Sequence, residues 1–144
     1  MLRFQGNGSA WSPIAVEAYG EGGLPQIHGD GCYAAVLLEG VSHWRVKELA
    51  VTNEAETRSV RQGICICGSP QGITEDIVIE GCEISRVAGE NRRARDVYQS
   101  MYWNSGIYVT MPGRSSDKNH LHDIIISNNY VHDVFTLSLI HISE

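Results

Sequence analysis

The sequence lacks the long apolar run and the block of basic residues that would point to two common classes of protein. No apolar stretch approaches the about 18 residues that a membrane-spanning helix needs. The 11 lysines and arginines are outnumbered by 17 acidic residues and form no long block, which argues against a nucleic-acid partner. A composition with 42% hydrophobic and 19% charged residues is that of a folded chain, and 144 residues suffice for one compact domain.

Patterns typical of metal sites are also scarce. Cys65 and Cys67 are spaced two apart without the second ligand pair of a zinc site, and no cluster of aspartates has the spacing of a calcium loop. A disulfide between two cysteines at this spacing on a strand would be strained. We therefore expect four free thiols, with Cys32 and Cys82 as the other two, and we assign no metal-binding residue and no cofactor from the residues themselves.

Helical periodicity is weak, and the best candidate, residues 91–102, has no clean apolar stripe. What the chain contains instead is repetition. One unit has two alternating apolar positions, a small or polar corner and a second alternating pair, and it recurs at residues 44–53, 77–86 and 124–133. A shorter unit recurs at residues 35–38, 63–66 and 106–109. Such self-similarity indicates a solenoid, in which each repeat buries its apolar face by stacking on its neighbours.

The alignment of the repeats predicts which side chains stack, because equivalent residues of adjacent coils lie about 4.8 Å apart. The predicted interior columns are Val46–Ile79–Ile126, Val51–Ile84–Val131 and Val36–Ile64–Ile107. The predicted outer columns are Lys47–Glu80–Ser127, Asn53–Arg86–Asp133 and the pair Glu83–Tyr130. Asn128 and Asn129 are expected at a corner, where asparagine tolerates left-handed backbone and can bond along the stack.

The repeats are further apart than a bare coil of about 20–25 residues requires. The excess predicts two insertions that leave the coil as loops, at residues 88–104 and 111–120. Long loops on a rigid scaffold are common places for binding and catalytic residues.

The motifs GI-x-I and I-x-I-x-N-N-x-(I/V)-x-D resemble the right-handed parallel β-helix of pectate-lyase-like proteins, and the likeness covers roughly residues 12–136. Residues 12–22 and 25–31 are similar to the early coils of secreted bacterial polysaccharide-degrading members. The resemblance implies an all-β, right-handed parallel β-helix of about four coils. It also implies a polysaccharide partner, in our prediction an acidic one, and export of the parent protein to the periplasm or beyond.

The resemblance implies lyase or glycosidase chemistry, and calcium as a cofactor if the protein is a lyase of this kind. The alternative is a non-catalytic adhesin or carbohydrate-binding stalk, because the repeat motif is structural and recurs with many activities. The oligomeric state is not specified.

Three groups of residues are candidates for substrate binding. In the first insertion, arginines would hold sugar carboxylates and aromatic rings would stack on sugars, although a solvated loop fits the pattern equally well; these residues are Arg92, Arg93, Arg95, Tyr98, Tyr102 and Trp103. Glu83 beside Tyr130 is an outward carboxylate next to an aromatic ring. Arg58 or Arg61 would serve as a lyase base or carboxylate clamp, but an ion pair with Glu54 or Glu56 is the favoured interpretation.

The pair His132-Asp133 would suit catalysis, but such a pair more often closes a turn, which is the interpretation favoured here.

The two ends of the sequence raise separate expectations. No basic segment followed by an apolar one comes after Met1, so no signal peptide is recognised. Residues 137–144 resemble one translated frame of a transposon adapter used in sequencing libraries. We therefore expect a partial β-helix domain over residues 1–136, incomplete at both ends, and a non-native tail over 137–144. The alternative for the tail is a genuine strand.

Overall fold

The computed structural model describes residues 1–57, 59–90 and 104–136. Within these ranges the chain forms twelve β-strands and no helix. The strands are β1 (Leu2–Phe4), β2 (Ile14–Val16), β3 (Gln26–His28), β4 (Ala34–Glu39), β5 (Trp44–Lys47), β6 (Ala50–Asn53), β7 (Gln62–Cys67), β8 (Thr74–Glu80), β9 (Glu83–Gly89), β10 (Ser105–Thr110), β11 (Leu121–Ser127) and β12 (Tyr130–Thr136). The described part of the chain accordingly offers no helix that could cross a membrane.

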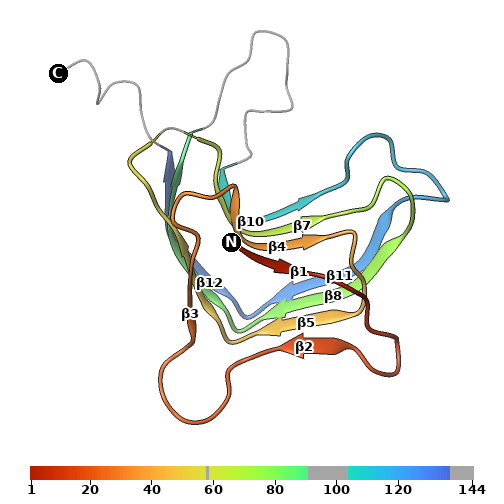
Figure 1. Cartoon of the computed structure of the whole chain (residues 1–144), viewed down its shortest axis with the longest axis horizontal. Helices are drawn as coiled ribbons and strands as arrows, with labels where there is room; N and C mark the ends of the chain where they lie inside the picture. Colours follow the sequence, from red (N-terminus) through yellow and green to blue (C-terminus); the bar gives the residue numbers. More distant parts are fainter. Residues whose placement is uncertain (58, 91–103, 137–144) are drawn as a thin grey trace, which may run out of the picture.

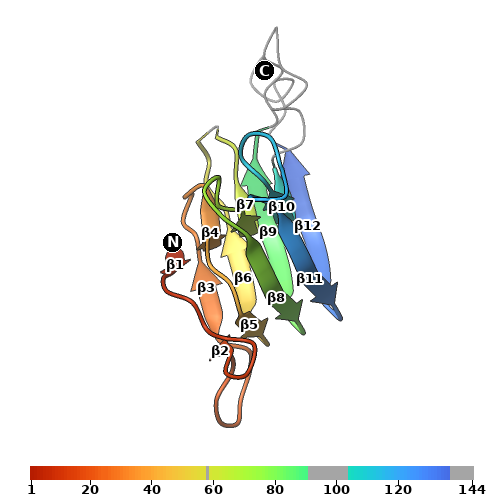
Figure 2. The ribbon, with the colours of Figure 1, turned by 90° about the vertical axis from the view of Figure 1, so that its right-hand side faces the viewer.

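Successive strands belong to three different parallel sheets of four strands each. The strand orders are β1-β4-β7-β10, β2-β5-β8-β11 and β3-β6-β9-β12, so every third strand returns to the same sheet. In Figure 1 the chain passes from β1 through β2 and β3 to β4 in a clockwise path. Figure 2, in which the right-hand side of Figure 1 faces the viewer, shows the coils side by side from β3 at the left to β12 at the right, so the later coils lie farther from the viewer in Figure 1. Clockwise progress away from the viewer is a right-handed coil. The predicted right-handed parallel β-helix of four coils is confirmed.

The predicted interior columns are confirmed residue by residue. Val46 pairs with Ile79 and Ile79 with Ile126; the columns through Ile84 and Ile64 have the predicted register as well. Members of the second and third coils are fully buried, as Val46 of the second coil and Ile79 and Ile84 of the third illustrate. These aliphatic side chains form the core, because a coil alone has no second layer on which to bury its apolar face.

Steric contacts explain why the shorter repeat begins with glycine at residues 63 and 106. A Cβ atom on Gly63 would come within 2.5 Å of both the carbonyl oxygen of Gly106 and Cγ2 of Ile84. Gly106 occupies the equivalent position in the next coil, where a Cβ atom would meet Val131 Cγ1 at 2.5 Å. The third and fourth coils therefore require glycine at this position, whereas the second coil accommodates Ala35 there.

The first coil contains a strand that the repeats did not predict. β1 pairs in parallel with β4, and the ring of Phe4 stacks on Trp44 with centroids 4.6 Å apart. The indole Nε1 of Trp44 donates a hydrogen bond to the carbonyl of Gly6. A strand of three residues is too short to display an alternating pattern in the sequence.

Residues with positive φ are aligned across the coils. His43, Asp76 and Asp123 have φ of 62°, 57° and 54°, and Arg86 and Asp133 have φ of 48° and 53°. At each site the strand alternation is interrupted: Thr74 is buried, Glu75 and Asp76 are partly exposed, and Ile77 is buried. A left-handed residue thus lets two consecutive side chains face outward between two inward ones.

The same irregularity corrects one predicted column. Asn53 does not stack on Arg86; a register shift between Thr52 and Asn53 pairs Asn53 with Val87. Asn53 is fully buried, accepts a hydrogen bond from Gly31 N and donates to the carbonyls of Cys32 and Gln62. It holds the corner between the second and third coils from inside.

The other corner predictions are confirmed. Asn128 has φ of 54°, and Asn129 bonds to the preceding coil through Cys82 N and the carbonyl of Ile79. Lys47 lies beside Glu80 with 3.8 Å between Nζ and Oε2. All four cysteines are free thiols.

The predicted insertion at residues 111–120 holds no strand apart from an isolated bridge between Ser116 and Asn119. The first insertion begins later than predicted, because Ala88 and Gly89 complete β9.

Candidate functional site

The predicted sugar-binding residues divide between described and undescribed parts of the chain. Six of them lie outside the described residues, and their role stays a prediction: Arg92, Arg93, Arg95, Tyr98, Tyr102 and Trp103. Arg58 and the weak helical candidate at residues 91–102 also lie outside the described residues.

Glu83 and Tyr130 are neighbours, as the repeat alignment predicted, because Tyr130 of β12 pairs with Glu83 of β9. The tyrosine is 64% exposed. The imidazole of His132 stacks on its ring with centroids 4.2 Å apart, and His132 Nε2 lies 2.9 Å from Glu83 Oε1. The candidate pair is therefore a cluster of three side chains on the outer face of β9 and β12.

His132 takes a larger part in this cluster than the favoured turn-closing interpretation allowed. Its Nδ1 lies 2.8 Å from Asp133 Oδ2, so the ring bridges the carboxylates of Glu83 and Asp133. The hydrogen bond to Glu83, followed by that to Asp133, raises the pKa of His132 above its ordinary value. The ring occupies the interval between the two carboxylates, which leaves no open space between them for a glycosidic oxygen.

Arg61 is a buried structural residue, and the structure gives it neither of the two predicted surroundings. The residue is 1% exposed. Its guanidinium donates to the carbonyls of Gly31, Thr57 and Ala88 and to the hydroxyl of Thr57. These bonds hold its nitrogens inside the corner between coils, so it lies away from any surface on which a sugar would bind. Sequence patterns do not distinguish such a buried arginine from a surface one.

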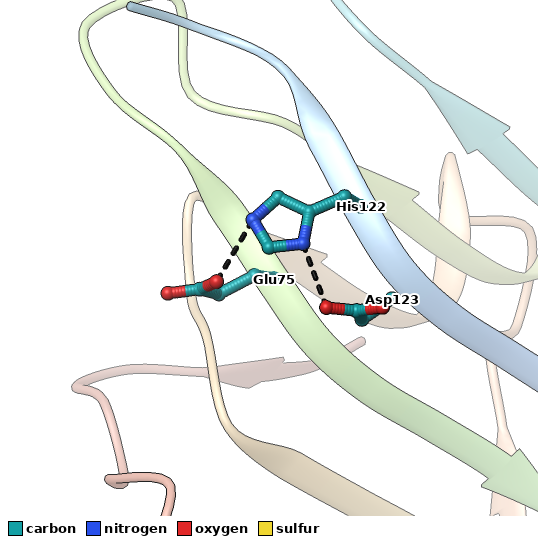
Figure 3. A group of neighbouring side chains, drawn as sticks. All are labelled: Glu75, His122 and Asp123. Carbon is teal, nitrogen blue, oxygen red and sulfur yellow. Dashed lines mark hydrogen bonds and ion pairs between the residues drawn. The ribbon is translucent and has the colours of Figure 1, made fainter.

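A network of ionisable side chains covers the outer face of β5, β8 and β11. Glu75 of β8 lies between two histidines: its Oε2 is 2.8 Å from His122 Nε2, and its Oε1 is 3.8 Å from His43 Nε2. Figure 3 shows the His122 ring between Glu75 and Asp123, with Asp123 Oδ2 at 2.8 Å from Nδ1. His43 Nδ1 is likewise 2.8 Å from Asp76 Oδ2.

Arg45 completes this network through a 2.8 Å ion pair between Nη2 and Asp76 Oδ1. Burial by itself would raise the pKa of Asp76, but the hydrogen bonds from His43 and Arg45 outweigh it and lower that pKa below its ordinary value. The aligned repeats contained the signal for this network. The column His43–Asp76–Asp123 stands three positions before the column Val46–Ile79–Ile126. The column Ser42–Glu75–His122 stands four positions before it.

A third feature lies on the outer face of the first sheet. A cavity of about 810 Å³ is bounded by the ends of β7 and β10 and by the residues that follow β10; its lining consists of Tyr33, Cys67, Tyr108, Thr110, Met111, Pro112, Gly113 and Arg114. Tyr33 is 46% exposed, and its hydroxyl accepts a hydrogen bond from Gln62 Nε2. Burial of the remainder of the ring raises the pKa of Tyr33, with the bond to Gln62 opposing it. The tyrosine is neutral at ordinary pH and presents a polar tip and an apolar ring.

The fold places the chain among parallel β-helix proteins, and comparison with known proteins agrees. No family model matches the chain, and no curated protein matches it. Two crystal structures of a GH136 lacto-N-biosidase from Eubacterium ramulus are similar in fold. The selenomethionine derivative superposes with a TM-score of 0.68 at 16% identity over 92% of this chain, and the native protein with 0.66 at 17% over 88%.

The chain spans about a quarter of the length of that enzyme, 26% and 25% in the two structures. At this level of identity the likeness establishes the β-helix architecture. The architecture that the family resemblance implied is thus confirmed, and the two similar structures are of a glycoside hydrolase rather than a pectate lyase.

Proposed function

We propose that this chain is part of a polysaccharide-active β-helix protein and that it binds a glycan in the cavity lined by Tyr33, Tyr108 and Arg114. The observation that carries the proposal is the cavity itself. Its volume of about 810 Å³ falls within the about 300–1,000 Å³ range of small-molecule sites. Two tyrosine rings offer apolar faces to sugar C–H groups, and the hydroxyl of Thr110 and the guanidinium of Arg114 offer hydrogen bonds.

The sugar is acidic in this proposal. Arg114 is the cation in the cavity lining, and a guanidinium pairs with a carboxylate through two parallel hydrogen bonds. The faces of β8, β9, β11 and β12 are less suited to a polyanion, because Glu75, Glu83, Asp123 and Asp133 would repel it. The arginines predicted to bind sugar carboxylates, Arg92 among them, remain part of the proposal without a described position.

The reaction is a separate step of the proposal. The parent protein would act as a glycosidase or a lyase. It would do so outside the cell or in the periplasm, where polysaccharide substrates occur. The similar solved structures, which are of a lacto-N-biosidase, support the glycosidase reaction. The competing function is glycan binding without catalysis, as in an adhesin or stalk. It is favoured by the described cavity lining, which contains aromatic, hydroxyl and guanidinium groups and no carboxylate. Calcium stays an expectation from the family resemblance.

Binding is tested with two tyrosine variants. Oligosaccharides of a uronate-containing and a neutral glycan are titrated into the chain by calorimetry. Tyr108→Ala should weaken binding by the about 1–3 kcal/mol that burial of an aromatic side chain contributes. Tyr130→Ala, which removes the ring of the other candidate site, should leave affinity within about twofold, a difference well below 1 kcal/mol. Circular dichroism of both variants checks that the coil is intact.

Arg114→Ala should remove any preference for the uronate chain while retaining binding of neutral sugar. Loss of binding in Tyr130→Ala with none in Tyr108→Ala would move the sugar site to the face of β9 and β12. The reaction is tested by incubating the parent protein with the same glycans and measuring new reducing ends and unsaturated products. Binding without either product would leave the adhesin or stalk function.

A further inference from the structure

The stack of coils has an unpaired strand edge at each end. Within the described residues, β1, β2 and β3 each lie at one edge of their sheet, and β10, β11 and β12 each lie at the opposite edge. Figure 2 shows β3 and β12 at opposite ends of the stack. Free edges leave backbone N–H and C=O groups available to another strand. We call the edge of β1, β2 and β3, with its inward side chains, the first-coil face, and that of β10, β11 and β12 the fourth-coil face.

The fourth-coil face exposes side chains that belong to the interior columns. Val109, Ile126 and Val131 are 39%, 45% and 44% exposed. Each lies in a column whose member in the third coil is fully buried. The three residues come from three different strands, so together they form an apolar surface across the whole end of the coil. An exposed apolar surface of this kind is typical of a contact with another protein segment.

The first-coil face carries the matching surface. Val16 stands at the head of the column that ends at Ile126, and Ile27 at the head of the column that ends at Val131. Both side chains point toward the core and are only partly buried. The first coil of another molecule, placed one coil beyond β10, β11 and β12, would therefore continue these columns without a change of register.

We propose that the fourth-coil face binds the first-coil face of a second copy of this chain, so that the coil continues from one molecule into the next. The contact would repeat the parallel pairing that already joins successive coils within the chain. An extended peptide would cover one of the three free edges, whereas a first coil covers all three. Two fourth-coil faces related by a two-fold axis would bring their strands together antiparallel, so the columns could not continue. The proposal is independent of the proposed glycan function.

The outward side chains at this junction are compatible with the contact. The same strand pairings would place Ala15 of the second copy over Ile125, and Gln26 over Tyr130. Ile125 and Tyr130 are 53% and 64% exposed, so each would gain a neighbour and lose contact with water. Neither pair brings two like charges together, which would be unfavourable on adjacent strands.

The association is tested by sedimentation velocity of the full chain from dilute to concentrated solution. A head-to-tail contact leaves one free face at each end of every oligomer, so we expect dimers, trimers and longer species that grow with concentration. A closed dimer that grows no further would overturn the proposal. A chain that stays monomeric at every concentration would also overturn it and would assign the fourth-coil face to another occupant, such as a further coil of a longer protein.

Variants of the two faces identify the contact. Ile126→Lys places a charge in the fourth-coil face, and Val16→Lys does so in the first-coil face. Each variant alone should associate about 10–100-fold more weakly than the unaltered chain, the fold-change expected when burial of one aliphatic side chain is lost. Mixed together, the two variants should form a dimer with one copy of each and nothing longer, because each variant retains one intact face.

Ile73→Lys is the matched control. Ile73 precedes β8 in the third coil, away from both faces, and it is 45% exposed, as Ile126 is. Its association should stay within about twofold of the unaltered chain. Circular dichroism checks that every variant keeps its strands, and Ile27→Lys replaces Val16→Lys if the latter does not fold. Folded variants whose mixture forms no dimer, or an equal loss of association in Ile73→Lys, would contradict the proposal.

Discussion

The third coil, β7–β8–β9, and the fourth coil, β10–β11–β12, carry similar residues in the same columns, yet these residues have different surroundings. Ile79 and Ile84 are fully buried, whereas their partners Ile126 and Val131 are 45% and 44% exposed. The third coil has paired strands on both sides, and the fourth is paired on one side within the described residues. Burial in this fold is therefore decided by the neighbouring coils rather than by residue type.

The polar residues of the two coils differ in a complementary way. The third coil contributes the carboxylates of Glu75 and Glu83, and the fourth contributes His122 and His132, each followed by an aspartate at positive φ. Each imidazole bridges its own aspartate and a glutamate of the preceding coil. What then separates the two clusters is a third neighbour: His43 beside Glu75, and the ring of Tyr130 against His132. One local motif thus has two different sets of neighbouring side chains.

The largest difference between the coils in the stability cost of a mutation is expected at Arg61 and its counterpart in the fourth coil, Asn104. In the third coil Arg61 donates to the carbonyl of Ala88; in the fourth, Asn104 donates to the carbonyl of Phe135, the residue that pairs with Ala88. Arg61→Met should lower the free energy of unfolding by about 3–5 kcal/mol, because it leaves several buried carbonyls without a donor. Asn104→Ala removes the hydrogen bond to the carbonyl of Phe135 at a half-buried position, and the loss of that bond should cost less, about 0.5–1.5 kcal/mol.

Urea unfolding followed by circular dichroism measures both variants. Equal costs would mean that the buried guanidinium of Arg61 contributes no more than the half-buried amide of Asn104. The distinction drawn between the two coils would then fail at this position.

A second difference in stability cost is expected between Ile79 of the third coil and Ile126 of the fourth, which lie in one column. Ile79→Ala creates a cavity among fully buried side chains and should cost about 2–5 kcal/mol. Ile126→Ala removes the same atoms from a position that is 45% exposed, so it should cost less than half as much. Both are read from denaturant midpoints at constant m-value. A cost for Ile126→Ala equal to that for Ile79→Ala would show that the fourth coil is as enclosed in solution as the third.

The smallest effect concerns His132, whose pKa is raised chiefly by Glu83. A raised folded-state pKa stabilises the fold fully at pH values below the unfolded value of about 6.5, and this contribution is lost as the pH rises through the folded-state pKa. Glu83→Gln should lower the pKa of His132, measured by NMR titration of the ring. It should also reduce the loss of stability that accompanies a rise in pH above about 6.5, the ordinary histidine pKa.

Glu21→Gln, at an exposed turn, serves as the control and should leave the His132 titration unchanged. A titration of His132 that is the same with and without Glu83 would contradict the contact between the two coils.

The sequence was sufficient for the stacking register because an aliphatic residue at the wrong position would face water. A shift by one residue along a strand exchanges its inner and outer faces, so the apolar columns specify a unique register. The same reasoning failed where strict alternation ends. Asp76, Arg86 and Asp133 adopt left-handed backbone, and nothing in a period of two predicts which polar residue will do so. The pairing of Asn53 with Val87 was missed for this reason.

The candidate sites depended more strongly on three-dimensional placement. The contact of Glu83 with Tyr130 followed from the repeat, since both belong to equivalent positions of adjacent coils. The columns Ser42–Glu75–His122 and His43–Asp76–Asp123 could also be read from the aligned repeats. Their side-chain contacts, such as His122 to Glu75, could not, because these depend on side-chain rotation and on the left-handed residues. The burial of Arg61 had no sequence signal either.

By itself, the sequence determined that this chain coils into a parallel β-helix and which aliphatic side chains fill its interior, because hydrophobic burial acts on every repeat in the same way. Only the tertiary structure decided which polar side chains meet. Their contacts arise from left-handed residues, a register shift and side-chain rotation, and each of these is set by neighbours on other coils rather than by the local sequence.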